Sequence, residues 1–368
     1  MLLVLRITSS GIAVGGLTAC QYGPILFLSP FGGAIADRVD KRRALLVTQA
    51  LEMLQSVGLA VLAFLPHPPL IGLYALALAG GMVLSLDNPL RRSFVTEMVP
   101  EAELANAVVL YSTIVNISRV FGPALAGLLA VTLGYGWCFA IDASTYVAVL
   151  YCVWVMDPRE LHRMPARPRA SGEVREGIRY ILATPMLWIS FGMLAAIGTL
   201  SYNFSVTLPL FVTRSLGQSE GVFTILYSTF SVGAVVSALV IARRGRVWLS
   251  QIVRGAAMMG IAMLLLSATR GIGTAIPAAF LVGMASILYM TSTTALVQVG
   301  TRREMQGRLL ALQAVFVAGT GVIGGPICGW LADRAGGRAP IVFGGVVCLL
   351  AAGFGQVAAR KTQSAARG

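Results

Sequence analysis

The chain has 368 residues, of which 57% are hydrophobic and 12% are charged, and its formal net charge is +13. Soluble domains carry about 25% charged residues, so this composition excludes an ordinary soluble protein and indicates a polytopic membrane protein with little soluble mass. The basic residues gather in short loops between long apolar runs, so they indicate membrane topology and not a nucleic-acid partner.

The N-terminal residues 1–10 are apolar, but they are too few for a spanning helix, which needs about 20 residues. The segment Leu17-Thr-Ala-Cys20 looks like a lipoprotein cleavage site. No basic residue precedes the apolar segment, and Arg6 interrupts it, so we expect no signal peptide. The first apolar run long enough to cross a membrane is therefore Gly11–Ala36.

A dense block of charge follows this run. Residues 37–43 hold six charged side chains, four of them basic. A Lys or Arg at the bilayer centre costs at least about 2.5–3.5 kcal/mol, so the block cannot lie in hydrocarbon. We predict a tight loop between two membrane helices, and its basic excess places it on the cytoplasmic side.

The remaining apolar runs follow in order and form two groups. The first group covers 44–65, 70–89, 104–133 and a run that ends at Met156; the second covers 185–212, 221–242, 247–268, 273–300, a run that ends near 332, and 339–359. We therefore expect an N-terminal helix bundle over 1–156, a cytoplasmic linker over 157–184 and a C-terminal six-helix bundle over 185–368. In the linker, Ser171 can cap an amphipathic helix that lies on the inner membrane surface.

The distribution of Lys and Arg supports one topology. Most of the 28 basic residues fall in loops assigned to the cytoplasm, whereas the loops assigned to the outside hold only Arg214, Arg270, Arg334 and Arg338. This frame places the C-terminus in the cytoplasm, and with eleven helices it places Met1 outside.

Part of the charged loop is repeated late in the chain. Pro30-Phe-Gly-Gly-Ala-Ile-Ala-Asp37-Arg38 matches Pro326-Ile-Cys-Gly-Trp-Leu-Ala-Asp333-Arg334 in spacing. Internal repeats are typical of secondary transporters. The second Asp-Arg pair falls on the outer side in the predicted topology.

The charged loop resembles the signature loop of the major facilitator superfamily, Gly-x-Leu-x-Asp-Arg-x-Gly-Arg-Arg. The matching positions are Gly33, Asp37, Arg38, Lys41 and Arg42, with Asp40 standing where the family has Gly. The resemblance implies that Asp37 contacts a neighbouring helix end and helps to gate the cytoplasmic side.

Further motifs are similar to the branch that contains the enterobactin exporter and macrolide efflux proteins. They include Asp87 with Arg91, and Arg119-x-x-Gly122-Pro123, which is similar to a motif of exporters in this superfamily. The resemblance implies an all-α, polytopic fold with about eleven of the twelve helices of a two-bundle (6+6) transporter, most of helix one being absent.

Four ionisable residues lie within the apolar runs, where burying a charge is costly. We expect Arg119, near mid-membrane, to hold an anionic substrate group or pair with a carboxylate, and Asp142 to bind and release a proton. Glu52 and Arg254 lie on helices that are peripheral in the family, so we expect scaffolding or snorkelling for both. From the family architecture, the substrate pocket is expected to include Tyr202, Asn203, Tyr289 and Gln298.

The leading hypothesis is a secondary-active, proton-coupled exporter of a small molecule such as a drug or siderophore. It would work by alternating access, as a monomer, in the bacterial cytoplasmic (inner) membrane. The sequence contains no phosphate-binding loop, so we expect no direct use of ATP. We expect no enzyme activity, cofactor or metal site, because His67 and His162 lie in loops and the cysteines lack metal-site spacing. The alternative is a truncated, transport-incompetent membrane protein.

Overall fold

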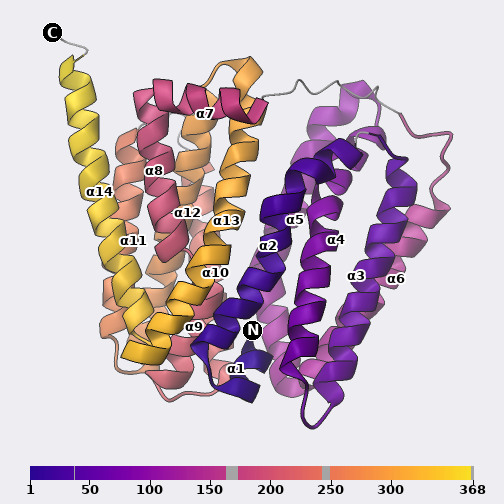
Figure 1. Cartoon of the computed structure of the whole chain (residues 1–368), viewed down its shortest axis with the longest axis horizontal. Coiled ribbons are helices and arrows are strands. Elements are labelled where there is room, and N and C mark those ends of the chain that lie inside the picture. Colours follow the sequence, from indigo (N-terminus) through magenta and orange to yellow (C-terminus); the bar gives the residue numbers. More distant parts are fainter. Residues whose placement is uncertain (37, 163–172, 243–248, 366–368) are drawn as a thin grey trace. The chain divides into compact units, whose positions relative to one another are not determined.

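The structure is a computed structural model that describes residues 1–36, 38–162, 173–242 and 249–365 (Figure 1). These residues form helices joined by short loops, and they contain no strand. In chain order the helices are α1 (Leu2–Thr8), α2 (Gly11–Ala36), α3 (Lys41–Phe64), α4 (Leu70–Glu97), the short 3-10 helix η1 (Glu101–Glu103), α5 (Leu104–Thr132), α6 (Tyr135–Val155), α7 (Glu173–Ala183), α8 (Pro185–Leu200), α9 (Phe204–Arg214), α10 (Glu220–Ala242), α11 (Leu249–Ala268), α12 (Ile272–Val299), α13 (Arg303–Ala335) and α14 (Ala339–Ala365).

Within the described residues, ten segments are long and apolar enough to cross a membrane, and one of them joins α8 and α9. They do not include α5, a 29-residue helix in which several side chains, among them that of Arg119, lie outside the described part. The predicted all-α membrane fold is confirmed.

Loop residues explain several helix boundaries. Asp40 caps α3, because its side chain accepts a hydrogen bond from the backbone N–H of Arg43 at 3.1 Å. This gives a local role to the residue that departs from the family pattern. Pro69 directly precedes α4 and Pro185 begins α8, positions where the missing N–H costs little.

The chain divides into two compact units. Residues Leu17–Arg169, with Arg6–Thr8, form the N-terminal unit, and Ala170–Gly368 form the C-terminal unit together with Met1–Leu5 and Ser9–Gly16. The first turns of α2 therefore pack with the C-terminal unit, and the rest of that helix belongs to the N-terminal unit. In the N-terminal unit, α3 packs against both α4 and α6.

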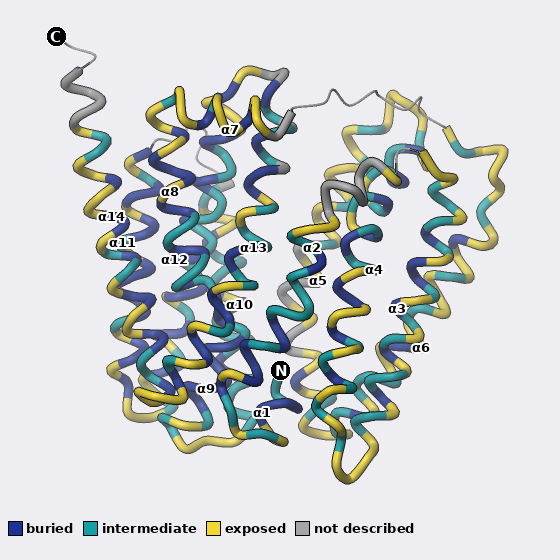
Figure 2. Tube along the Cα trace, in the orientation of Figure 1, coloured by how far each residue is buried: buried dark blue, intermediate teal, exposed yellow. Residues whose placement is uncertain are grey.

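The C-terminal unit has the larger buried core. Helices α8, α10, α11, α12 and α14 surround a cluster of apolar side chains in which Ile197, Ile252, Met259 and Val282 are fully buried. Figure 2 shows buried residues recurring along α11 and α12, between intermediate and exposed ones. Helix α7 packs on α8 and α13 through Ile181.

The helices also expose large apolar side chains. Ile71 is 80% exposed, and Phe27 and Leu350 are each more than two-thirds exposed. A soluble surface would not carry so many exposed apolar residues, whereas hydrocarbon accommodates them without cost. The outward-facing side chains therefore fit a lipid environment.

Two helices differ from the sequence prediction. The run predicted as one helix over 185–212 is interrupted at residues 201–203, between α8 and α9. The run predicted to end at Pro89 instead continues to Glu97, with Pro89 inside α4.

Candidate functional site

A cluster of polar side chains lies inside the N-terminal unit. Its centre is Asp87 on α4, which has no exposed surface. One carboxylate oxygen of Asp87 accepts hydrogen bonds from the hydroxyl of Thr48 and from the side-chain amide of Gln49, each at 2.8 Å. The other oxygen accepts from the guanidinium of Arg91, with Nε at 2.8 Å and Nη2 at 2.7 Å. Two neutral donors and two nitrogens of one guanidinium group thus contact the carboxylate of Asp87.

Glu52 on α3 joins the same cluster with weaker contacts. Its Oε2 atom lies 3.4 Å from Nη2 of Arg91 and 3.2 Å from the amide nitrogen of Gln49. The hydroxyl of Tyr146 on α6 also hydrogen-bonds to Glu52. The residue is only 6% exposed. Burial therefore contradicts the predicted snorkelling of Glu52, whose side chain points to its polar partners on α4 and α6. The alternative prediction, a scaffolding role, is compatible with these contacts.

Asp142 lies on α6, one turn before Tyr146. Its Oδ2 atom accepts a hydrogen bond from the hydroxyl of Ser56 on α3 at 2.6 Å. The residue as a whole is exposed, in contrast to Glu52. Glu52 and Asp142 thus both make polar contacts between α3 and α6, but only Glu52 is buried.

The basic residues after the charged loop bind the ends of neighbouring helices. Lys41 forms an ion pair with Glu97, and both side chains are largely buried. The guanidinium of Arg42 donates to the carbonyls of Val153, at 2.9 Å, and Trp154, at 2.5 Å. A cation at these last carbonyls of α6 is also favoured by the helix dipole. The two side chains fasten the start of α3 to the ends of α4 and α6.

Only some of the other predicted gating and helix-five residues lie in the described part of the structure. Arg38 is exposed in the turn. Asp37 and the surroundings of Gly33 lie outside the described residues, as do the side chains of Arg119 and Pro123. Gly122 lies on the exposed side of α5, where an added Cβ would meet no atom within 4 Å among the described residues.

In the C-terminal unit, the predicted pocket residues Tyr202 and Asn203 lie at the interruption between α8 and α9. The hydroxyl of Ser201 donates to the carbonyl of Gly344 at 2.8 Å, and the amide of Asn203 donates to the carbonyl of Thr199 at 2.7 Å. The Asn203 amide thus satisfies a carbonyl that the break leaves without its helical partner, and the Ser201 hydroxyl links the break to α14. Transporters commonly build substrate sites at such discontinuous helices.

The remaining pocket candidates lie in different surroundings. Tyr202 reaches α12, where its hydroxyl lies 3.5 Å from the carbonyl of Ser286. Tyr289 is fully buried in the core of the unit, and Gln298 is exposed near the end of α12. The structure therefore places Tyr202 and Asn203 at the helix break and separates Gln298 from them along α12.

The second Asp-Arg pair of the sequence has a clear structural role. The carboxylate of Asp333, on α13, accepts hydrogen bonds from the backbone N–H groups of Gly11 at 2.7 Å and Ile12 at 2.9 Å, and from the hydroxyl of Ser10 at 3.1 Å. Arg214 forms an ion pair with the same carboxylate at 2.7 Å. Asp333 thus caps the start of α2 from another helix.

Glycines allow α2 and α13 to approach this closely. A Cβ atom at Gly329 would lie 2.0 Å from the carbonyl oxygen of Gly11, and one at Gly15 would lie 2.4 Å from that of Gly325. Each helix carries two glycines four residues apart, which is the pattern of close helix contacts in membranes. The sequence analysis missed this pattern, although it is visible in the sequence.

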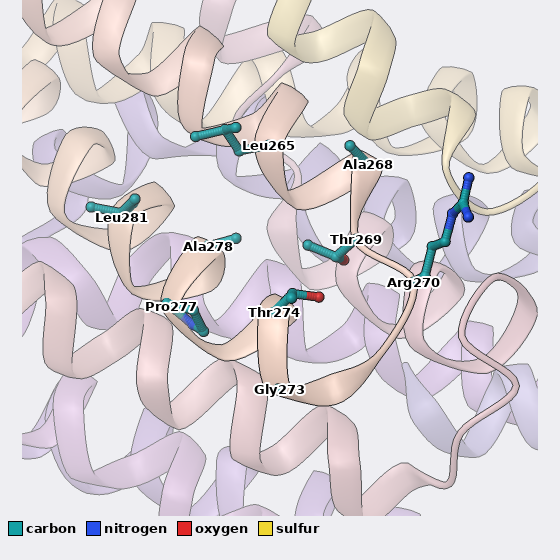
Figure 3. A pocket seen from close by; sticks show the side chains of 9 residues that line it. All are labelled: Leu265, Ala268, Thr269, Arg270, Gly273, Thr274, Pro277, Ala278 and Leu281. Carbon is teal, nitrogen blue, oxygen red and sulfur yellow. The ribbon is translucent and has the colours of Figure 1, made fainter.

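A separate pocket of about 590 Å³ lies between the end of α11 and the start of α12 (Figure 3). Its lining is mainly apolar or small, and Figure 3 shows Arg270 at its edge with the guanidinium directed away from Leu265 and Leu281. The lining contains none of the predicted site residues, so the polar groups of interest lie elsewhere.

Comparison with known proteins identifies the family. A family described as transmembrane secretion effector, of the major facilitator superfamily, matches residues 2–366. A staphyloferrin A transporter of Staphylococcus aureus is 25% identical over 268 residues, which cover 70% of this chain and 67% of that protein. An enterobactin exporter of Salmonella typhi is 26% identical over 228 residues, 61% of this chain and 54% of that protein. The match thus spans about half the length of the exporter.

Solved structures agree on the fold. A bacterial homologue of the human lysosomal transporter Spinster superposes with a TM-score of 0.74 at 17% identity, covering 97% of this chain and 90% of its own. A POT family transporter gives a TM-score of 0.70 at 14% identity, covering 98% and 96%. With the family match over nearly its whole length, the chain belongs to the transmembrane secretion effector family of major facilitator superfamily transporters.

Proposed function

We propose that this transporter exports a siderophore or a similar small molecule from the bacterial cytoplasm, and that the proton gradient drives export. The observation that carries the proposal is the match of residues 2–366 to a family of secretion effectors, together with relatives that transport staphyloferrin A and export enterobactin. Transport would proceed by alternating access, in the cytoplasmic membrane, with the C-terminus in the cytoplasm and the chain as a monomer.

The charged side chains within the membrane support proton coupling. The buried acids Asp87 and Glu52 form a network with the partly exposed Arg91, and charged residues within the membrane part of transporters mark ion or proton pathways. We retain Asp142 and Arg119 as candidates for the transport path, the former through its hydrogen bond to Ser56 and the latter from its place in the sequence.

The helix break in the C-terminal unit supports a substrate site there. Tyr202 and Asn203 lie where the backbone leaves the helical path, and Asn203 is 4% exposed. Aromatic and amide side chains offer an apolar face and hydrogen-bond donors, a combination suited to small organic molecules. Tyr289 and Gln298 stay candidates on α12 from the family architecture alone, because Tyr289 is buried in the core and Gln298 lies near the end of that helix.

Uptake into inverted membrane vesicles tests the proposal directly. The probes are staphyloferrin A and enterobactin, each with and without an imposed pH gradient. We expect accumulation of at least one probe, abolished when an ionophore collapses the gradient. An inserted protein that gives no gradient-dependent flux for either probe would contradict this proposal and favour the alternative of a transport-incompetent membrane protein.

A further inference from the structure

The network of Asp87, Glu52 and Arg91 in the N-terminal unit has more negative than positive charge, and its two acids are buried while the Arg91 side chain is 43% exposed. Asp87 and Glu52 are both carboxylates, and Arg91 is the cation that contacts them. The guanidinium lies 2.7 Å from Asp87 and 3.4 Å from Glu52, so it neutralises the former first. With both acids ionised, the second negative charge would remain unpaired in a low-dielectric interior, where such charges are expensive.

No other described cation makes up this difference. From α6, the groups that face Glu52 are the hydroxyl of Tyr146 and, beyond it, the acid Asp142. The basic residues at the start of α3 lie about 14 Å or more from Glu52 along the helix, and Lys41 among them is paired with Glu97. The neighbours of Glu52 on α3 are neutral.

A second observation concerns the amide of Gln49. Its nitrogen donates to both acids, Glu52 at 3.2 Å and Asp87 at 2.8 Å. Its oxygen is buried and, among the described residues, receives no hydrogen bond. A buried acceptor without a donor costs free energy, and a protonated carboxyl group on Glu52 would be a donor beside that same amide.

We propose that Glu52 is the residue that binds and releases the coupling proton of this transporter, an inference that rests on the proposed proton-coupled export. A proton from water adds to one carboxylate oxygen of Glu52, which removes the excess negative charge and creates an O–H donor for Gln49. Release of the proton to water restores the anion, which Arg91, Gln49 and Tyr146 then stabilise.

Asp87 and Asp142 fit this role less well. The four donor contacts of Asp87 use both of its oxygens, so this carboxylate has its hydrogen-bond partners in place. Asp142 lies on an exposed stretch of α6 and accepts a hydrogen bond from Ser56. Glu52 is the buried acid whose ionised form is least compensated.

The first test measures protonation itself, in purified protein reconstituted in lipid vesicles. Infrared difference spectra recorded across a pH series report the C=O stretch of any carboxylic acid that gains or loses a proton. We expect a titrating band that disappears in Glu52→Gln and persists in Asp142→Asn. The matched control is Glu101→Gln, which removes an exposed acid of η1 and is expected to leave the band unchanged.

Glu52→Asp keeps a titratable group and is expected to restore a band, which separates loss of the proton site from misfolding. If every titrating band of the wild type survives in Glu52→Gln, or if the band is lost in Asp142→Asn instead, the proposal is overturned.

The second test measures coupling and separates the two proposals. In inverted vesicles, Glu52→Gln is expected to lose accumulation driven by a pH gradient, with Glu52→Asp recovering part of it. Accumulation at the wild-type level in Glu52→Gln would overturn the inference while leaving proton-coupled export intact. A wild-type protein without gradient-driven flux, but with a band that depends on Glu52, would refute the proposed export and leave the proton site established.

Discussion

The carboxylate of Asp333 on α13 accepts a hydrogen bond from the backbone N–H of Gly11, the first residue of α2, at 2.7 Å. These residues are separated by most of the chain, yet the contact reproduces an N-terminal helix cap, which is usually made by the residue just before the helix. The family signature implies a similar role for Asp37, contact with a neighbouring helix end. Among the described residues, Asp333, at the repeat of the motif, makes a contact of this kind.

Removing this cap is expected to destabilise the C-terminal unit. Replacing an N-cap residue costs about 0.5–2 kcal/mol, and Asp333→Ala also leaves Arg214 without its ion-pair partner. We expect a lower midpoint of thermal unfolding in detergent for Asp333→Ala, and a smaller decrease for Asp333→Asn, which keeps one acceptor oxygen. The exposed acid Glu103 provides the control, Glu103→Gln; an equal midpoint for all three variants would contradict a capping role.

The close glycine contact between α2 and α13 makes a second prediction. Gly329→Ala would place a methyl group 2.0 Å from the carbonyl oxygen of Gly11, so the helices must separate and lose their packing. Gly353→Ala is the matched control, because a Cβ there meets no described atom within 4 Å.

Since Ala is about 1 kcal/mol better than Gly in a helix, the control is expected to be neutral or stabilising. Thermal unfolding in detergent measures both variants. A Gly329→Ala protein as stable as Gly353→Ala would show that the contact is not required.

The ion pair between Lys41 and Glu97 can be measured by a double-mutant cycle. Removing one partner of a buried pair costs about 3–5 kcal/mol, because the other charge is left without compensation. We expect Lys41→Met and Glu97→Leu to be strongly destabilising alone, and the double variant to be more stable than their sum predicts. Additive effects in chemical unfolding would mean that the two residues do not interact.

Asn203 is expected to maintain the interruption between α8 and α9. Asn203→Ala leaves the carbonyl of Thr199 without its donor, and an unsatisfied buried group costs about 1–3 kcal/mol. We expect a lower unfolding midpoint and weaker binding of the transported probe. Asn88 is exposed on α4, so Asn88→Ala is the control. Unchanged probe binding in Asn203→Ala would place the substrate away from this break.

The predicted topology can be checked by labelling single cysteines in a variant without the five native ones. Arg159→Cys and Arg270→Cys place exposed thiols in loops predicted to lie inside and outside, respectively. A membrane-impermeant maleimide added to intact cells is expected to label only the cysteine at position 270, because the bilayer protects the other. The reverse labelling pattern would invert the orientation.

The helices could largely be predicted from the sequence, because a membrane span needs about 20 apolar residues and the loops are marked by charge. The interruption at 201–203 could not be predicted, since the run there is continuous. The break is held by hydrogen bonds from Ser201 and Asn203 to carbonyl groups, one of them on another helix. Similarly, Pro89 suggests a helix end, but α4 continues because its neighbours bury the following turn.

The site was predicted only in part. Asp87 and Arg91 were identified by their motif, and the structure brings them together. Scaffolding or snorkelling is predicted for Glu52 because its helix is peripheral in the family. Its polar partners come from α4 and α6, so its environment follows from how three helices pack, which a single apolar pattern does not encode.

The assignment of Ser9–Gly16 to the C-terminal unit affects how the protein can be divided. A fragment that begins after residue 16 would remove the contacts that α2 makes with the carboxylate of Asp333 and with the backbone of Gly325 and Gly329. Two co-expressed fragments, divided between residues 162 and 173, would instead keep both sides of this contact, the start of α2 and the residues of α13. Residues Ser9–Gly16 therefore bind the C-terminal unit although they precede the N-terminal one in the chain. Complementation by separately expressed halves should depend on retaining them.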